Sequence, residues 1–278
     1  MRTAAVAAEF GRDLAADFAI VERLVGEARG AGVSLLALPE ACLGGYLSHL
    51  EGGADDPPAL DPDGPEIRRL ARLAGDLVVC AGYCEDAGDR RYNSAVCVTG
   101  DGVLGRHRKV HQPLRENASY AAGDRFAAFD TPVGRLGMML DYDKAFPESA
   151  RSLASGGARI VACLCAWATS SRTSSLARDH QARLFDVYDC VRAVENQVVF
   201  VSANQAGSFG SLRFVASAKV VDPGGEVLAT TGVSAGMAVA ELDVPAALEV
   251  ARRSMAHLRD RRPDAYRPLP EDQSLALA

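Results

Sequence analysis

Several features that mark whole classes of protein are absent from this sequence. No run approaches the roughly 18 apolar residues that cross a membrane. The first ten residues, MRTAAVAAEF, contain no long apolar core followed by a cleavage site, so we expect no secretory signal peptide. Basic residues are not in excess, because 30 Lys and Arg stand against 36 Asp and Glu, a net charge of -6. These absences predict a cytoplasmic protein that binds neither nucleic acid nor a membrane surface.

Lysine and aromatic residues are also scarce. The only lysines are Lys109, Lys144 and Lys219, and aromatic residues make up 6% of the chain. Cysteine is more frequent, but the seven cysteines are odd in number and scattered through apolar segments, unlike a disulfide framework. They have no His or Cys partners at the spacing of zinc ligands. We therefore expect reduced, mostly buried thiols and no metal site.

The composition fits a globular protein of one domain. The chain has 278 residues, of which 48% are hydrophobic and 24% charged. No Ser/Gly linker, low-complexity block or internal repeat divides it. We expect a single domain over residues 1–278, in which 262–278 form a C-terminal tail.

Short apolar runs alternate with amphipathic segments along the chain. Apolar runs bounded by turn residues predict strands, and a 3.6-residue apolar period predicts helices. The predicted strands are 3–8, 33–38, 77–83, 93–98, 102–106, 135–140, 160–165, 198–203, 215–221, 227–229 and 237–242. The predicted helices are 13–30, 66–74, a helix from Pro147 to the Gly156-Gly157 pair, and 174–196. This interleaving predicts a layered α/β domain in which helices cover sheets.

Three predicted strands are followed by an ionisable residue. Glu40 follows LLALP, Lys109 ends the segment GRHRK after a hairpin, and Asp141 follows GRLGMML. Ligands of α/β proteins bind beyond the carboxyl ends of strands, so these residues are candidates for a site. Taken singly, each is more simply interpreted as an exposed charge.

Six ordered segments resemble motifs of the nitrilase superfamily, the carbon–nitrogen hydrolases. They are LALPEACLGGY (36–46), GRHRKVHQP (105–113), GRLGMMLDYDKAFPESAR (134–151), RAVENQVVFVSANQAG (192–207), VDPGGEVLA (221–229) and DRRPDAY (260–266). The resemblance covers nearly the whole chain. It implies a nitrilase-like α-β-β-α four-layer sandwich, with two mixed sheets face to face and helices outside. It also implies a small-molecule substrate, no cofactor or metal, and a homodimer or higher homo-oligomer.

The resemblance assigns roles to individual residues. Members of the superfamily use a Glu-Lys-Cys triad with a second glutamate nearby. By position, Glu40 matches the general base, Lys109 the cation and Glu116 the second glutamate. Asp141 stands where the family has its nucleophilic cysteine, and the residues beyond it remain in register. Tyr46, Tyr142 and Trp167 are candidates to line the substrate pocket, although Trp167 is equally expected as a core aromatic.

Neighbouring residues are interpreted as supporting this group. His107 and His111 flank Lys109 without partners at metal-ligand spacing. Asp143 is expected to hold the turn that follows Asp141. Cys165 is the better of two candidates, with Cys42, to replace the absent thiol, but packing in a strand is the simpler interpretation of both.

Four interpretations of Asp141 remain open. The residue can be a base, acid or oxygen nucleophile in an enzyme that acts on a carbon–nitrogen bond of a small amide, carbamoyl or related substrate. Such an enzyme would hydrolyse, cyclise or condense its substrate. Alternatively the protein is an inactive binding or partner protein, an engineered Cys→Asp variant of a thiol amidase, or a protein in which Asp141 only caps a helix. Because three carboxyls would face Lys109, we expect at least one to be protonated near neutral pH.

Overall fold

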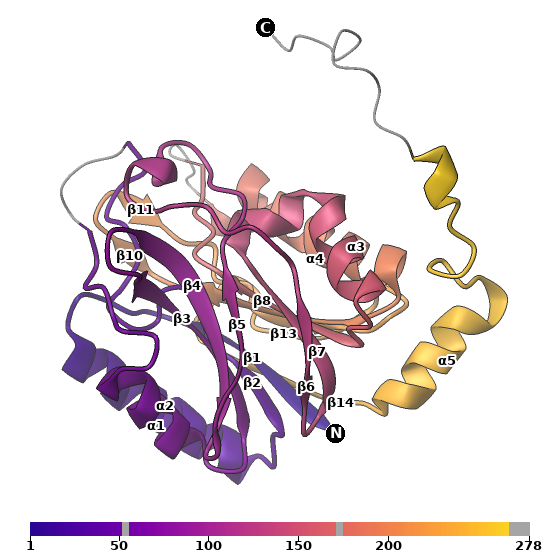
Figure 1. The fold of residues 1–278 in the computed structure, drawn as a ribbon, viewed down its shortest axis with the longest axis horizontal. Helices are drawn as coiled ribbons and strands as arrows, with labels where there is room; N and C mark the ends of the chain where they lie inside the picture. The colour runs from indigo at the N-terminus through magenta and orange to yellow at the C-terminus, as the bar shows by residue number, and fades with distance from the viewer. Residues whose placement is uncertain (52–55, 171–174, 267–278) are drawn as a thin grey trace, which may run out of the picture.

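The computed structural model describes residues 1–51, 56–170 and 175–266, and its elements follow the predicted interleaving (Figure 1). The helices are α1 (Leu14–Gly30), α2 (Pro65–Ala74), α3 (Pro147–Ser155), α4 (His180–Asn196) and α5 (Val244–Ser254). The strands are β1 (Arg2–Ala8), β2 (Leu35–Ala37), β3 (Val78–Asp86), β4 (Arg91–Thr99), β5 (Gly102–Arg108), β6 (Ala128–Thr131), β7 (Gly134–Leu140), β8 (Ile160–Cys165), β9 (Val199–Gln205), β10 (Ser208–Phe209), β11 (Leu212–Arg213), β12 (Lys219–Val221), β13 (Val227–Thr230) and β14 (Gly236–Glu241). Short 3-10 turns are η1 (Glu116–Ala118), η2 (Asp141–Ala145), η3 (Leu176–Arg178) and η4 (Pro263–Ala265).

Twelve of these strands form one mixed sheet that is folded along β1. Its order is β5-β4-β3-β2-β1-β9-β8-β7-β6, while β14 pairs with β1 and β12 pairs with β9 and β13. β1 runs parallel to β2, but only its last residues, Ala7 and Ala8, pair with β9. The two sheets that the resemblance implies are therefore the two halves of one sheet, joined at the end of β1.

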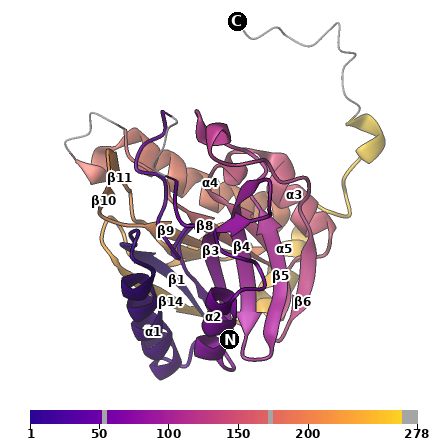
Figure 2. The same ribbon diagram turned by 60° about the vertical axis from the view of Figure 1, so that its left-hand side comes forward.

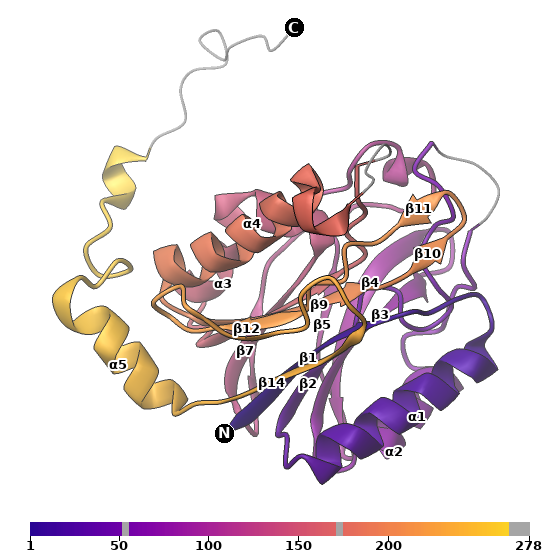
Figure 3. The same ribbon diagram turned by 180° about the vertical axis from the view of Figure 1, so that it is seen from behind.

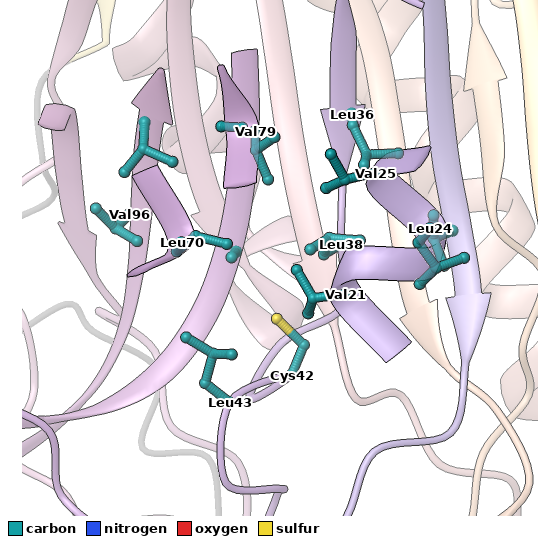
Figure 4. Close-up of a cluster of buried hydrophobic side chains, with 14 of the residues drawn as sticks. Val21, Leu24, Val25, Leu36, Leu38, Cys42, Leu43, Leu70, Val79 and Val96 are labelled. Carbon is teal, nitrogen blue, oxygen red and sulfur yellow. The ribbon is translucent and has the colours of Figure 1, made fainter. Parts of the chain in front are cut away.

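Three buried clusters fill the interfaces of a four-layer sandwich. Helices α1 and α2 cover one half of the sheet, and α3 and α4 cover the other (Figures 2 and 3). Val21, Leu24, Leu70 and Val79 belong to the outer cluster beneath α1 and α2 (Figure 4). The central cluster joins the two halves, and the third packs β7, β8 and β9 against α3 and α4. This is the predicted α-β-β-α architecture.

Local sequence explains where several elements begin. Asp13 caps α1, because its carboxylate accepts hydrogen bonds from the backbone N–H groups of Ala15 and Ala16. β8, IVACLC, is buried along its whole length, as expected for a parallel strand covered on both faces.

Some predicted boundaries are wrong. The helix predicted from 174 begins at His180, because Asp179 caps it. The predicted strand 215–221 is shortened to Lys219–Val221, since residues 216 and 217 have positive φ angles of 59° and 57°. β6, α5 and the small β10–β11 hairpin were not predicted from the sequence.

α5 lies at one side of the sandwich (Figure 3), and the segment after it still contacts the domain: the backbone N–H of His257 donates to Oε1 of Gln197, and Arg261 donates to Oγ of Ser155. Of the predicted tail, residues 262–266 contain η4, and 267–278 lie outside the described residues. Within the described residues, no helix combines the length and the apolar character needed to cross a membrane.

Candidate functional site

The four residues singled out as a possible triad and its second glutamate lie together at one edge of the sheet. Glu40 follows β2, Lys109 follows β5 and Asp141 follows β7. These strands run in the same direction through successive pairings, so their carboxyl ends meet at that edge. Glu116, in η1, completes the group.

Lys109 lies at the centre of this group. Its Nζ is 2.9 Å from Oε1 of Glu40, 2.9 Å from Oε2 of Glu116 and 3.5 Å from Oδ2 of Asp141. The exposed fraction is 1% for Lys109, 0% for both glutamates and 5% for Asp141. A lysine ammonium has three N–H donors. Each donor of Lys109 therefore has a carboxyl to face, and the contact with Asp141 is the longest.

Further donors fix the two glutamates. Asn93 Nδ2 donates to Oε1 of Glu40 at 2.5 Å and to Oε1 of Glu116 at 2.8 Å. The backbone N–H of Ala166, just after β8, donates to Oε2 of Glu40 at 2.6 Å. Sequence reasoning missed Asn93; its only signal was a polar side chain at the start of an otherwise apolar strand.

Burial and crowding change the acidity of the group. Burial raises the pKa of Glu40 well above its usual range, Lys109 opposes the shift, and Asp141 and Glu116 add to it. Burial likewise raises the pKa of Glu116, against the effect of Lys109. For Lys109, burial lowers the pKa, but the surrounding carboxylates outweigh it and raise the pKa well above normal. Lys109 is therefore a persistent cation, and Glu40 is a carboxyl that readily holds a proton.

Asp141 occupies a strained turn. Its φ is 45°, in the left-handed region that Asp and Asn tolerate better than most side chains. Ala41, next to Glu40, has a φ of 52°. The interpretation of Asp141 as a helix cap is wrong, because the side chain of Asp141 caps neither η2 nor α3 and its Oδ2 faces Lys109.

Asp143 holds the turn in place. Its carboxylate accepts hydrogen bonds from the backbone N–H groups of Leu140, Val110 and His111. His107 Nε2 and His111 Nδ1 lie 3.0 and 2.9 Å from its two oxygens. Burial alone would raise the pKa of Asp143, but these hydrogen bonds hold it well below its usual range. Asp143 and both histidines thus support the loop, as the sequence suggested.

A cavity of about 310 Å³ opens at Asp141. All three predicted pocket aromatics line it, together with Leu50, Pro113, Leu114 and other small or polar residues. Trp167 also packs edge-on against Phe185, with ring centroids 6.0 Å apart, so it belongs to the core as well as to the cavity. Among the described residues that line the cavity, only Asp141 is charged.

The two alternative thiols do not line the cavity. Cys42 packs in the cluster beneath α1, and burial raises the pKa of its thiol. Cys165 faces Cys163, with their sulfur atoms 3.5 Å apart, in the cluster on the α3 and α4 side. Within 1–51, 56–170 and 175–266, no group of three or more His, Cys, Asp or Glu is arranged to hold a metal ion.

Gly82 in β3 allows the turn at Glu40 to pack closely against this strand. A Cβ at Gly82 would press against the backbone N of Ala41 and lie 2.7 Å from Cα of Glu40. Because backbone atoms cannot move aside cheaply, we expect Gly82→Ala to lower the free energy of unfolding by about 1–3 kcal/mol. Gly26→Ala is the control, because nothing lies within 4 Å of that position in α1. It should add about 0.5–1 kcal/mol. Urea unfolding compares them, and a fully stable Gly82→Ala protein would contradict the packing argument.

Comparisons of the sequence with known proteins give matches that agree with one another. A sequence model described as carbon-nitrogen hydrolase matches residues 2–252. The chain is 32% identical over 232 residues to a nitrilase of Pyrococcus abyssi, covering 82% of this chain and 84% of that protein. It is 33% identical over 232 residues to an (R)-stereoselective amidase of Pseudomonas sp, covering 82% and 79%.

One solved structure adds a comparison of the fold. An amidase from Nesterenkonia sp. AN1, in a mutant form, superposes with a TM-score of 0.77 at 23% identity over 95% of each chain. That structure shows covalent addition of the acetamide moiety of fluoroacetamide at its active site cysteine. The likeness confirms the four-layer architecture.

Proposed function

The chain belongs to the carbon–nitrogen hydrolase family and is a nitrilase-like enzyme of the amidase type, and we propose that it works without a thiol at residue 141. The supporting observation is the placement of Asp141. It follows β7, where the motif resemblance puts the family's nucleophilic cysteine, and it lies beside Lys109 at the cavity. In this proposal Asp141 takes the position of that cysteine and has a direct part in the reaction.

We assign acid–base work to Asp141, in preference to covalent attack. Attack by a carboxylate on an amide carbon would create a reactive acyl anhydride, whereas proton transfer needs only contact with the reacting group. In hydrolysis, the oxygen of water bonds to the substrate carbon while Asp141 accepts a proton. Asp141 then gives that proton to the departing nitrogen. An internal amine or hydroxyl in place of water would give cyclisation or condensation.

The surrounding residues have separate roles in this proposal. Lys109 pairs with Oδ2 of Asp141, and Glu40 and Glu116 hold Lys109 in position. Burial raises the pKa of both glutamates, which favours their protonated forms and lets the group hold a proton beside an ionised carboxylate. The three cavity aromatics contact the apolar part of the substrate.

A substrate screen tests this proposal. Small amides, carbamoyl compounds, amidines and nitriles are assayed for ammonia release with the wild-type protein and with Asp141→Asn. We expect turnover by the wild type and a loss of about 10²–10⁴-fold in the variant, the usual contribution of an acid–base group. Asn tolerates the positive φ at this position, so the variant should keep its fold.

Asp130→Asn is the matched control. Its side chain is 84% exposed and pairs with Arg135 at the surface, so turnover should be unchanged. If no compound in the screen is turned over by wild type or variant, the enzymatic proposal fails and a non-catalytic binding protein becomes the better interpretation. If Asp141→Asn retains full activity, Asp141 has no part in the reaction.

A further inference from the structure

One carboxylate oxygen at the cavity has no partner. Oδ1 of Asp141 is buried, and no described residue hydrogen-bonds to it, while Oδ2 is 3.5 Å from Lys109. The residue is 5% exposed and lines the cavity. An acceptor left unpaired in a buried place costs about 1–3 kcal/mol. A ligand that fills this cavity is therefore expected to bring an N–H donor to Oδ1.

The described residues that line the cavity offer a carbonyl oxygen only uncharged side-chain donors, such as those of Tyr46, Tyr142 and Gln181. The three N–H donors of Lys109 already face Glu40, Glu116 and Asp141. No other described residue that lines the cavity is cationic. Hydrolysis of an amide builds negative charge on its carbonyl oxygen, and that charge needs directed donors. The one charged group at the cavity, the carboxylate of Asp141 with its unpartnered Oδ1, is thus better matched to a group that donates hydrogen bonds than to a developing negative charge.

The net charge of the site also favours a cationic ligand. Three carboxyls surround one ammonium, so the group carries a net negative charge while at least two of the carboxyls are ionised. Aromatic rings at the same cavity, those of Tyr46, Tyr142 and Trp167, present faces that attract cations. A carboxylate surrounded by aromatic side chains suits a cation attached to an apolar body.

We propose that the reacting group of the substrate is an amidinium, whose N–H groups donate to Asp141 while its hydrocarbon part lies among Leu50, Tyr142 and Trp167. This inference rests on the proposed function and names its substrate class. An amidinium is planar, carries only donors on its two nitrogens, and matches a carboxylate well.

The reaction then balances without a redox partner. The oxygen of water bonds to the amidinium carbon, and one proton of that water passes to Asp141. Asp141 returns the proton to one nitrogen, the bond from carbon to that nitrogen breaks, and the nitrogen leaves as ammonia. The remaining O–H proton passes to the ammonia, so the products are an amide and ammonium. The tetrahedral intermediate formed from an amidinium is neutral, which explains why no spare oxyanion donor is required.

Isothermal titration with three matched probes tests the inference. Benzamidinium, benzamide and benzoate have nearly the same shape but carry charges of about +1, 0 and −1 near pH 7. We expect benzamidinium to bind wild-type protein at least ~10-fold more tightly than either of the others. Asp141→Asn should lose that preference, and Asp130→Asn should keep it, because Asp130 lies at the surface and lines no part of this cavity.

The possible outcomes separate this inference from the proposed function. Equal or tighter binding of benzamide or benzoate, no binding of any probe, or a preference that survives Asp141→Asn would each overturn the amidinium assignment. Turnover of amides without a charge preference would leave the proposed function standing and remove only this inference. Turnover of an amidine, together with a preference for benzamidinium that Asp141→Asn abolishes in a folded protein, would support it.

Discussion

Replacing Asp141 by Cys is expected to give a protein that fluoroacetamide modifies covalently at residue 141. The reason is that the other parts of a thiol site are already in place. Glu40 and Lys109 lie together beside this position, and a cavity of about 310 Å³ leads to it. Glu40 would take the thiol proton, and the thiolate would attack.

Intact-mass spectrometry and peptide mapping measure this outcome. We expect one acetamide moiety at residue 141 of the variant and none there in the wild type or in Asp141→Ser. The background should be low, because every native cysteine except Cys190 is buried. Circular dichroism checks the fold, since Cys adopts a positive φ less readily than Asp. A folded Asp141→Cys protein that stays unmodified, or reacts only at Cys190, would contradict the placement of Asp141 at the nucleophile position.

Much of the site could be predicted from the sequence, because several of its residues directly follow the ends of predicted strands. Glu40 and Asp141 each follow a buried apolar run, and parallel strands bring their carboxyl ends to one edge. Lys109 was identified in the same way after the β4–β5 hairpin. Glu116 was different, because it lies in the short η1 turn, where no periodicity operates, and only the resemblance to the family identified it.

Contacts between residues far apart in the sequence could not be predicted. Nothing in the local pattern of β1 shows that its last two residues leave β2 and join β9, although this folds the sheet into two facing halves. Asn93 was missed for the same reason, since its partners lie 53 and 23 residues away. The other two lysines are a further example. The sequence assigned no role to Lys144 or Lys219, yet both are buried and meet at one carboxylate of α4.

That carboxylate, Asp189, joins three separate elements behind the site. Its Oδ1 is 2.9 Å from Nζ of Lys144 in η2, and its Oδ2 is 2.9 Å from Nζ of Lys219 in β12. Lys219 has a second acidic partner, Asp186, whose side chain is 55% exposed. The Nζ of Lys144 otherwise lies over aromatic rings, 3.0 Å from the ring centroid of Phe185. Lys144 therefore depends on Asp189 for its charge partner within the described residues.

We expect Asp189→Asn to lower the free energy of unfolding by about 3–5 kcal/mol, because it leaves Lys144 buried without a counter-charge. Asn has nearly the same volume, so the loss would come from charge and not from a cavity. Urea unfolding at pH 7 measures it. Asp130→Asn is the matched surface control and should change stability by less than about 0.5 kcal/mol. An Asp189→Asn protein within about 1 kcal/mol of the wild type would mean that the lysines are uncharged or rehydrated.

The pH dependence of stability in the wild type and in Asp189→Asn tests the same ion pairs. Burial raises the pKa of Asp189, but Lys144 and Lys219 outweigh burial and hold the pKa below its usual value. A carboxyl whose folded pKa is depressed contributes stability above its unfolded pKa of about 3.9, and that contribution disappears as the pH falls through the folded value. The difference in stability between wild type and Asp189→Asn should therefore be constant from pH 5 to 7 and shrink below about pH 4. A difference that stays constant down to pH 2 would show that Asp189 acts through packing, whereas one that shrinks would identify the ion pairs as the source of stability behind the Asp141 turn.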